Sequence, residues 1–376
     1  MTTTRVAHII HDLRPGGTER RLLAVLRGLE RERFEPILVC IDGFGPLIED
    51  VEELGLKPFV LGRVHRFDPT GIHRLVKLLR SEKVEIVHGW LSLGNAFGRI
   101  AGTLARVPVR IAAEGAAVTT ASHSRARRDK VIDRLLDPAT TAYVANSETV
   151  AVCLRAKGLS SAKIVVIPNG VAIPEPLSDA RRVRLRSSLG ASPDMAVVGM
   201  VGRLDPDFKD HHTFLTAVAS LLQDGRLVRG VVIGDGPARG TLERFAEALG
   251  IEGDVVFTGY RPDAVDLLQA LDVAVYLTYS EGFSNVVLES MAAGVPLMAT
   301  DIPSNREAVS HGLDGLLVQI RNPQATCVAL RRLLDDQAFA RRLGEAGRRR
   351  VSEHYSLQAQ AQATMQLYER MLEMRR

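Results

Sequence analysis

Residues 196–237, AVVGMVGRLDPDFKDHHTFLTAVASLLQDGRLVRGVVIGDGP, contain one complete strand–helix–strand pattern. An apolar run at 196–201 ends in a Gly/Asp/Pro turn, a segment of helical period follows, and a second apolar run ends in Gly234. Short buried strands separated by helices are typical of a parallel sheet, because parallel neighbours need a long crossover connection. The stretch therefore predicts an α/β fold.

The same rhythm runs through the rest of the chain. In the first half we expect a helix at Thr18–Glu30 and strands near Val6–Ile10, Pro36–Ile41, Ile86–His88, Val109–Ala113, Ala142–Ala145 and Ile164–Ile167. In the second half the strand-length runs are AVVGMVGRL, GVVIGDGP, DVVFTGY, DVAVYLT, GVPLMAT and GLLV. The proline-rich segment Ile173–Ser178 breaks both periods, so we expect two domains joined there.

The composition excludes several classes of protein. With 46% hydrophobic and 24% charged residues among 376, the chain is neither disordered nor collagen-like. Cys40, Cys153 and Cys327 lack the Cys-x-x-Cys spacing of a zinc site and do not form a disulfide framework, so we expect a reducing, cytoplasmic setting. The polar start and the lack of an 18-residue apolar run predict neither a signal peptide nor a membrane span.

The charge is unevenly distributed. Residues 1–175 contain 25 Lys and Arg against 19 Asp and Glu, and residues 176–376 contain 23 against 25, which sums to a net charge of +4. This small surplus does not indicate nucleic-acid binding, which needs clustered cations. It is compatible with a phosphorylated acceptor or an anionic membrane surface. The basic stretch at 122–130 fits such a contact and fits a solvated helix face equally well.

Ligands of parallel sheets bind at the carboxyl ends of the strands, so the loops after strands are the candidate sites. The first such loop contains Gly16 and Gly17, directly before an expected helix. A helix N-terminus offers unpaired N–H donors to an anion, and phosphate is the expected ligand. Paired glycines alone fit an ordinary tight turn equally well.

A second loop, GRLDPDFKDHH, contains Arg203 and Lys209 at one strand end. They could clamp a diphosphate, the arginine as a planar fork and the lysine as a point charge. Two ordinary surface cations are the alternative. The sequence Asp205-Pro206-Asp207 superficially matches the paired aspartates of metal-dependent sugar transferases, but the flanking cations already supply positive charge. We therefore predict a solvated turn there and no metal.

A third loop contains Gly234-x-Gly236-x-x-x-Gly240, which is loosely similar to a nicotinamide-cofactor site. The acidic residue expected at the end of the next strand is missing, so an oxidoreductase is disfavoured. Gly234 is instead expected in a turn that lets a ligand approach the backbone.

A fourth loop reads SEGFSNVVLES. Glu281 and Gly282 follow a strand, Ser284 is a candidate N-cap, and the helix beginning at Asn285 presents free N–H groups. Glu289 lies about one turn along this helix, where a carboxylate can accept hydrogen bonds from sugar hydroxyls. Taken alone, the two glutamates also fit a capping carboxylate and a surface residue.

The longer string SEGFSNVVLESMAAGVPLMATDIPSNREAV at 280–309 resembles the glutamate-x7-glutamate signature of the family 4 retaining glycosyltransferases. The segments VIPNGV, VGRLDPDFKDH, VIGDGP, FTGYRPD and GLDGLLV occur in that family's order and spacing, so the resemblance covers nearly the whole chain. It implies the GT-B architecture, with two Rossmann-like domains facing across a deep cleft. The implied parts are an acceptor domain at 1–172, a donor domain at 173–355 and a C-terminal helix at 356–376 that returns to the first domain.

The resemblance also implies roles for individual residues. Arg203 and Lys209 would hold the donor diphosphate, Glu281 would contact the transferring sugar, and Glu289 would bind the ribose. The other implied donor contacts are Gly16 and Gly17 across the cleft, backbone near Arg261 at the base, and Gly282, Phe283, Ser284, Asn285 and Val286 at the sugar and phosphates. Neither a metal nor another cofactor is implied.

The chain departs from the family pattern in two places. Lys209 lies six positions after Arg203, where the family more often has five, so the turn between them must bulge. Many relatives have a histidine after the strand corresponding to Arg110–Ala113, and Glu114 stands near that place here. Either Glu114 binds donor or acceptor hydroxyls, or the sugar pocket is built differently. His88, at another strand end, is a further pocket candidate, with a histidine satisfied by neighbouring backbone as the alternative.

These observations predict a retaining hexosyltransferase. It would move a sugar from a nucleotide diphosphate sugar to a hydroxyl of a glycan or lipid-linked acceptor, with a uridine donor preferred by the resemblance over a guanosine one. Bacterial polysaccharide or glycolipid assembly is the expected setting, with peripheral membrane contact left open. The alternatives are a non-catalytic nucleotide-sugar-binding subunit of a polysaccharide assembly complex and a nucleotide-sugar epimerase of similar shape.

Overall fold

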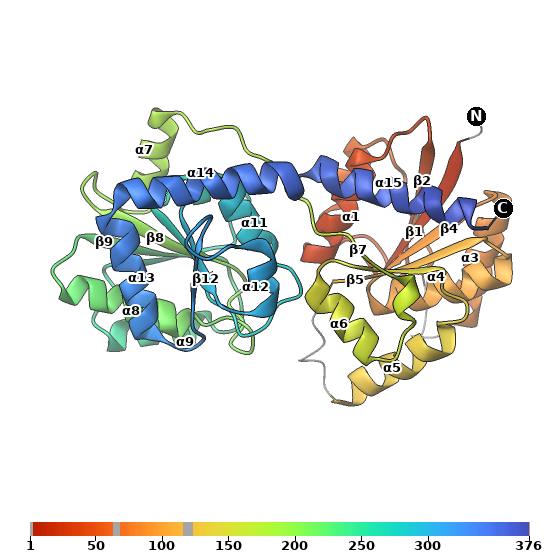
Figure 1. The fold of residues 1–376 in the computed structure, drawn as a ribbon, viewed down its shortest axis with the longest axis horizontal. Coiled ribbons are helices and arrows are strands. Elements are labelled where there is room, and N and C mark those ends of the chain that lie inside the picture. Colours follow the sequence, from red (N-terminus) through yellow and green to blue (C-terminus); the bar gives the residue numbers. More distant parts are fainter. Residues whose placement is uncertain (1–2, 63–67, 116–122, 376) are drawn as a thin grey trace. The chain divides into compact units, whose positions relative to one another are not determined.

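The computed structural model describes the following residues: 3–62, 68–115 and 123–375, without the side chains of 123–129. The chain forms two compact units (Figure 1). Unit 1 comprises residues 1–170 and 357–376, and unit 2 comprises residues 171–356. Within the described residues, no helix is long and apolar enough to span a bilayer.

Unit 1 is built on a parallel sheet with the strand order β3-β2-β1-β4-β5-β6-β7. The strands are β1 (Thr4–Ile10), β2 (Phe34–Cys40), β3 (Phe59–Val60), β4 (Ile86–Trp90), β5 (Val109–Glu114), β6 (Ala142–Ala145) and β7 (Ile164–Val166). The central strands are nearly continuous apolar runs because helices cover both faces of such a sheet. In β4 all five residues are buried.

The helices of unit 1 come from both ends of the chain. They are α1 (Gly17–Gly28), α2 (Ile48–Glu53), α3 (Pro69–Ser81), α4 (Leu91–Ala105), α5 (His123–Leu136), α6 (Glu148–Ala156), a 3-10 turn at Ser161–Lys163, and α15 (Leu357–Glu373). Helix α15 packs against α1. The two helices approach so closely at Gly28 that a Cβ added there would lie 2.3 Å from the Cβ of Ala361.

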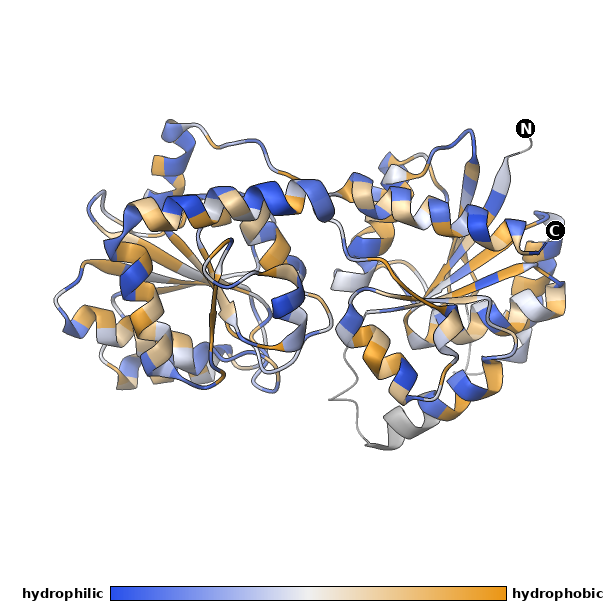
Figure 2. Cartoon of the chain, in the orientation of Figure 1, coloured by the Kyte–Doolittle hydropathy of each residue, from blue (hydrophilic) through white to orange (hydrophobic). Residues whose placement is uncertain are grey.

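Unit 2 contains a second parallel sheet, with the strand order β10-β9-β8-β11-β12-β13. Its strands are β8 (Ala196–Val201), β9 (Val228–Ile233), β10 (Val255–Gly259), β11 (Val273–Tyr276), β12 (Leu297–Thr300) and β13 (Leu316–Val318). Its helices are α7 (Asp179–Ser188), α8 (His211–Gln223), α9 (Arg239–Ala248), α10 (Ala264–Ala270), α11 (Asn285–Ala292), α12 (Pro303–Ala308), α13 (Pro323–Asp335) and α14 (Gln337–His354). Figure 2 shows hydrophobic colouring along much of the inner strands of each unit.

The sequence predictions of the α/β class and of the strands are confirmed, with small shifts at the strand ends. Strand β3 was not predicted, because it consists of only two residues at the sheet edge and lacks a buried apolar run. These residues, Phe59 and Val60, are 46% and 42% exposed. The predicted linker, Ile173–Ser178, has no regular secondary structure, and the hydroxyl of Ser178 caps helix α7. The basic stretch at 122–130 lies almost wholly outside the described side chains.

The interior of unit 1 contains an unusual group of buried aromatic and histidine rings. His8, His88 and Trp90 project from adjacent strands, and the His88 ring stacks on Trp90 with 4.4 Å between ring centroids. The His88 Nδ1 atom is 2.7 Å from the hydroxyl of Tyr368 on α15, and the indole N–H of Trp90 donates to Nδ1 of His8. Burial lowers the pKa of His8 to about 3, with a smaller effect from Arg31, and burial also lowers that of His88.

These lowered pKa values predict acid sensitivity of unit 1. The unfolded histidines protonate below about pH 6.5, whereas the folded ones resist protonation, so the unfolded chain binds more protons. The stabilisation contributed by these histidines should therefore be complete above pH 6.5. As the pH falls from 6.5 toward 3, the free energy of unfolding should decrease by up to about 1.4 kcal/mol per pH unit for each histidine. Trp90 is the single tryptophan of the chain, so its fluorescence in a urea titration reports on this region.

The matched variants are His88→Gln and His73→Gln. Removing the buried His88 should reduce the pH dependence of the urea midpoint between pH 7.5 and 5. Removing His73, which is exposed, should leave it unchanged. An equal pH dependence in all three proteins would contradict this account.

Candidate functional site

Three glycines bring the loops after β8, β9 and β10 together at the carboxyl edge of the unit 2 sheet. The N–H of Gly202 donates to the carbonyl of Ile233, and the N–H of Gly234 donates to that of Gly259, both at 3.0 Å. Gly234 has φ +138°, and a Cβ there would lie 2.0 Å from the oxygen of Gly202. The edge is therefore lined by bare backbone, which a ligand can approach closely.

Arg203 follows Gly202 directly and projects into solvent. Among the described residues, its guanidinium makes no hydrogen bond or ion pair. The next residues form the predicted turn: the Asp205 carboxylate accepts the N–H of Asp207 at 3.1 Å, and the Asp205 carbonyl accepts the N–H of Lys209 at 2.9 Å. This turn accommodates the extra residue between the two cations.

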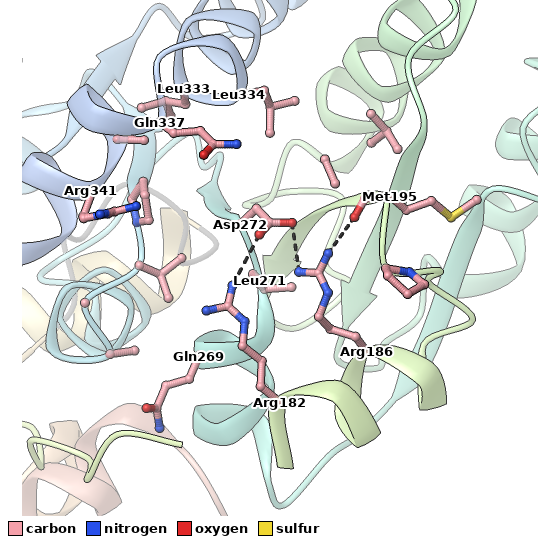
Figure 3. Close-up of a pocket in the computed structure, with 18 of the residues that line it drawn as sticks. Arg182, Arg186, Met195, Gln269, Leu271, Asp272, Leu333, Leu334, Gln337 and Arg341 are labelled. Carbon is pink, nitrogen blue, oxygen red and sulfur yellow. Dashed lines mark hydrogen bonds and ion pairs between the residues drawn. The ribbon is translucent and has the colours of Figure 1, made fainter. Parts of the chain in front are cut away.

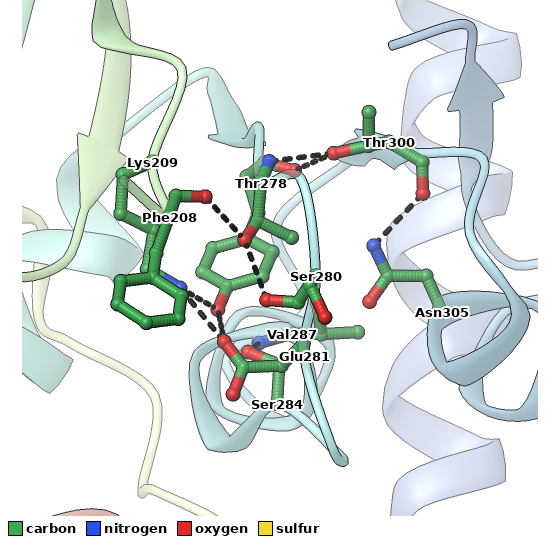
Figure 4. Close-up of polar contacts among 10 residues, drawn as sticks. Phe208, Lys209, Thr278, Ser280, Glu281, Ser284, Val287, Thr300 and Asn305 are labelled. Carbon is green, nitrogen blue, oxygen red and sulfur yellow. Dashed lines mark hydrogen bonds and ion pairs between the residues drawn. The ribbon is translucent and has the colours of Figure 1, made fainter. Parts of the chain in front are cut away.

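The backbone at Lys209 is attached directly to the strand end of β11. An isolated antiparallel bridge joins Lys209 to Thr278, and the N–H of Tyr279 donates to the carbonyl of Phe208 at 2.9 Å. The Thr278 hydroxyl also donates to the Phe208 carbonyl, at 2.8 Å, and Thr300 on β12 accepts the Thr278 N–H (Figure 4). The loop that carries Lys209 is thus held by hydrogen bonds to Thr278 and Tyr279, directly after β11.

The side chains of Lys209, Tyr276 and Glu281 form a compact polar cluster, which we call the lysine cluster. The Lys209 ammonium donates to the Glu281 carboxylate at 2.7 Å and also to the Tyr276 hydroxyl. The Tyr276 hydroxyl donates to the same Glu281 oxygen, Oε2, at 2.6 Å. The ammonium lies 4.4 Å from the centroid of the Tyr276 ring, within range of a cation–π contact.

The pKa values of the lysine cluster fix its charges at neutral pH. Burial alone would lower the pKa of Lys209, but Tyr276 and Glu281 outweigh it and the pKa is raised. Burial favours the neutral form of Glu281, yet Lys209 outweighs it and the carboxyl pKa is lowered. Burial raises the pKa of the Tyr276 hydroxyl. The cluster therefore holds an ammonium, a carboxylate and a neutral hydroxyl.

Helix α11 begins beside this cluster. The Ser284 hydroxyl accepts the N–H of Val287 and caps the helix, as predicted from the sequence. Phe283 is buried and packs against the ring of Tyr355, which anchors the loop before the helix. Asn285 and Val286 form the partly exposed first turn, and Glu289 is partly exposed one turn further on.

Arg261 lies in the loop after β10, where the resemblance implies contacts to a base. Its guanidinium makes a two-pronged pair with Asp263, at 2.7 and 2.6 Å, and the hydrogen bonds from Arg261 lower the pKa of that carboxyl. The side chain is thus held by its neighbour. The backbone of the loop, rather than this guanidinium, is the part suited to meet a ligand.

The candidates in unit 1 lie at strand ends of its own sheet. Gly16 occupies the N-cap position of α1, and a Cβ there would lie 2.3 Å from the carboxylate of Glu19, which folds back over the helix start. A carboxylate therefore lies where the sequence predicts a phosphate. Burial raises the pKa of Glu19 and so favours its neutral form. Gly17, the first helical residue, has open space at its Cβ position.

Glu114 ends β5 and is held by a neighbour that sequence reasoning did not identify. The Asn95 side-chain amide donates to the Glu114 carboxyl at 2.8 Å and to the Ala113 carbonyl at 3.0 Å, and its oxygen accepts the Ala113 N–H. Burial raises the pKa of the Glu114 carboxyl. Asn95 lies on α4, nineteen residues away, and no local pattern singles it out.

His88 differs from its predicted place. We expected it either in the sugar pocket or satisfied by backbone, but its ring is 1% exposed and packed between Trp90 and the hydroxyl of Tyr368. The physical reason is that all of β4 is covered on both faces, by helices that include the distant α15. The partner comes from 280 residues away, beyond the reach of any local pattern.

A pocket of about 900 Å³ lies at the opposite, amino edge of the unit 2 sheet (Figure 3). Three of its charged groups bind one another: Asp272 pairs with Arg182 and Arg186, and it also accepts the N–H of Val197 at 2.7 Å. Arg186 also donates to the Met195 carbonyl. These arginines tie α7 to the strand starts. Because ligands of parallel sheets bind at carboxyl ends, we place the site at the lysine cluster.

Tyr276 was not identified from the sequence. It is the last residue of the buried strand β11, and a side chain with a hydroxyl at that strand end could have signalled a polar partner. The string DVAVYLT otherwise has the pattern of an ordinary apolar strand, and nothing else in it singles out Tyr276.

Comparison with known proteins places both units in one group of enzymes. Residues 15–173 match the family model described as Glycosyltransferase Family 4, and residues 182–350 match that of Glycosyl transferases group 1. The chain is 27% identical over 352 residues, 89% of each chain, to an Escherichia coli UDP-Gal:alpha-D-GlcNAc-diphosphoundecaprenol alpha-1,3-galactosyltransferase. It is 30% identical over 291 residues to the D-inositol 3-phosphate glycosyltransferase of Corynebacterium glutamicum, covering 72% of this chain and 69% of that one.

Among solved structures, the Anabaena protein HepE in complex with UDP is similar, with a TM-score of 0.85. The match covers 97% of this chain and 100% of HepE at 20% sequence identity, so it concerns the fold.

The glycine contact predicts a specific sensitivity at the carboxyl edge. Gly234→Ala should destabilise unit 2 by about 1–3 kcal/mol, because the methyl group meets the Gly202 carbonyl and the backbone conformation is unfavourable for alanine. The measurement is the melting temperature by calorimetry.

Gly240→Ala is the matched control: Gly240 lies within α9 and its Cβ position is nearly free. This control should be neutral or stabilising. Equal melting temperatures for Gly234→Ala and the unmodified protein would refute the contact.

Proposed function

The chain belongs to glycosyltransferase family 4 and has the GT-B fold, and on this premise we propose that it is a retaining hexosyltransferase that uses a nucleotide diphosphate sugar. The proposed donor is a UDP-sugar, and the proposed acceptor is a hydroxyl of a glycan or lipid-linked sugar. One observation carries the proposal: Arg203 and Lys209 lie on a single loop at the carboxyl edge of the unit 2 sheet, and Lys209 contacts Glu281 just before α11.

The proposed site matches the electrostatic demand of the reaction. Breaking the bond between sugar and diphosphate puts negative charge on the leaving phosphate, while the sugar becomes oxocarbenium-like. Cations and helix N–H groups already directed there stabilise that charge without reorganising. Arg203 is exposed and able to form a two-pronged contact with a phosphate, and Lys209 adds a positioned point charge.

The carboxylates support attack on the same face of the sugar. Glu281 is engaged by Lys209 and Tyr276, which suits it to accept hydrogen bonds from sugar hydroxyls and not to attack carbon. No other carboxylate is clearly placed as a covalent nucleophile among the described residues of this edge. Retention would then follow from the acceptor hydroxyl attacking on the side that the diphosphate leaves, with the leaving phosphate accepting its proton.

The substrates and ligands of related proteins support the choice of substrates. The Escherichia coli relative uses UDP-Gal and a lipid-linked diphosphate acceptor, and HepE has been crystallised with UDP. We therefore propose a uridine donor and an acceptor from polysaccharide or glycolipid assembly. Because the arginine and lysine supply the positive charge, we propose that no metal is needed.

Replacing Arg203 tests the proposed role of the loop. Arg203→Ala should lower turnover about 10²–10³-fold, as expected for the loss of one preorganised donor. The assay measures UDP released from a panel of UDP-sugars, with and without a lipid extract as acceptor, in the presence of EDTA. Arg184→Ala, at an exposed arginine on α7, is the control and should retain full turnover.

Other outcomes of this assay identify the alternatives. Donor binding without any UDP release would indicate a non-catalytic nucleotide-sugar-binding subunit. Conversion of the donor without acceptor, with no net transfer, would indicate an epimerase. Undiminished turnover of Arg203→Ala would refute the role assigned to that residue.

A thermal-shift panel tests the base of the donor. A specific ligand at 100 times its Kd stabilises the folded state by about 2.7 kcal/mol, so the melting temperature should rise by several degrees. UDP and a UDP-sugar should produce this rise, whereas GDP and GDP-sugars should not. A rise with guanosine nucleotides alone would overturn the uridine assignment.

A further inference from the structure

The hydroxyl of Tyr276 occupies the centre of the lysine cluster. The residue is 2% exposed, its ring packs in the apolar core of unit 2, and its hydroxyl reaches both ions of the cluster. A tyrosine hydroxyl has one proton to donate and lone pairs to accept. Here it donates to Glu281 at 2.6 Å and accepts from Lys209, so both capacities are used.

The contact between Lys209 and Glu281 places both residues at the proposed site, but Glu281 then competes with the donor diphosphate for the charge of Lys209. A lysine paired with a carboxylate at 2.7 Å is already neutralised, yet the proposed reaction needs its charge at the donor diphosphate. The Lys209 side chain is only 12% exposed, so the ammonium cannot simply turn to bulk water. Opening the pair would leave the ammonium without its carboxylate, and a buried ion without a partner is strongly destabilising.

The tyrosine hydroxyl resolves this conflict. If Lys209 shifts its bond from Glu281 to a phosphate oxygen, the ammonium can keep its bond to the Tyr276 hydroxyl and its place over the ring. Glu281 can keep the hydrogen bond that the same hydroxyl donates. Neither ion is left unpaired at any stage. The carboxylate oxygen that Lys209 releases can then accept a hydrogen bond from a sugar hydroxyl.

We propose that Tyr276 is the positioning residue of this site: it holds Lys209 and Glu281 in place while their mutual ion pair opens to admit the donor diphosphate. This inference rests on the proposed function and adds a residue to it. Lysine has a long, flexible stem, so a fixed acceptor near its tip is what keeps the charge in one position.

The test uses Tyr276→Phe, which keeps the ring and its packing and removes the hydroxyl alone. We expect kcat to fall about 10- to 100-fold, the range for losing a hydrogen bond to a charged group, with a smaller change in the donor KM. Tyr143→Phe is the matched control. Tyr143 is a buried tyrosine of β6 in unit 1, outside the lysine cluster, and removal of its hydroxyl should leave kcat unchanged.

A second readout does not depend on turnover. Acetic anhydride labelling of the folded protein, followed by mass spectrometry, measures how readily the Lys209 amine reacts. We expect Lys209 to be labelled several-fold faster in Tyr276→Phe than in the unmodified protein. UDP should protect Lys209 fully in the unmodified protein and only partly in the variant.

The two readouts separate the inference from the proposed function. If the unmodified protein releases no UDP from any donor, the proposed function is wrong, and the labelling without nucleotide still decides whether Tyr276 holds Lys209. If Tyr276→Phe keeps full kcat, or if its Lys209 is labelled at the unmodified rate, the positioning role is refuted. Equal melting temperatures of the two tyrosine variants show that the fold is intact in both.

Discussion

Every pair of neighbouring strands in both sheets is parallel, and this constraint decides where chemistry can occur in the protein. Parallel strands place all their carboxyl ends at one edge, so loops far apart in sequence meet there. In unit 2 the loops meet so closely that Gly234 has no room for a side chain beside Gly202. At the same edge, backbone hydrogen bonds hold the Lys209 loop against the residues that directly follow β11. The result is a surface made largely of backbone, beside a loop that carries two cations.

The lysine cluster shows how a buried charge can be both stable and available. Burial of an unpaired ammonium is costly, so Lys209 needs the carboxylate of Glu281 in the free protein. A tight ion pair, however, competes with any phosphate that needs the same lysine. A neutral hydroxyl bonded to both ions eases this competition, because it remains a partner for each when they separate. Arg203 faces no such problem, since its side chain is exposed and makes no ion pair among the described residues.

Unit 1 depends on contacts across almost the entire chain. Helix α15, at the C-terminal end, supplies Tyr368 to the buried His88, and Gln360 of the same helix donates to the carbonyl of Arg21. The histidine rings therefore pack under a helix that lies 280 residues further along the chain. Their role is to fill and bond the interior, which explains why a histidine at a strand end is not by itself a sign of a ligand pocket.

The sequence by itself determined the α/β class, the strands other than the short edge strand β3, and the family, because apolar period, turn residues and motif spacing are local properties. It also singled out Lys209 and Glu281, but as separate candidates. Only the tertiary structure decided that they touch across 72 residues, that Tyr276 joins them, and that His88 is enclosed by Tyr368. The physical reason is that a local pattern encodes which residues form a strand, whereas a contact depends on which strands become neighbours and in what register.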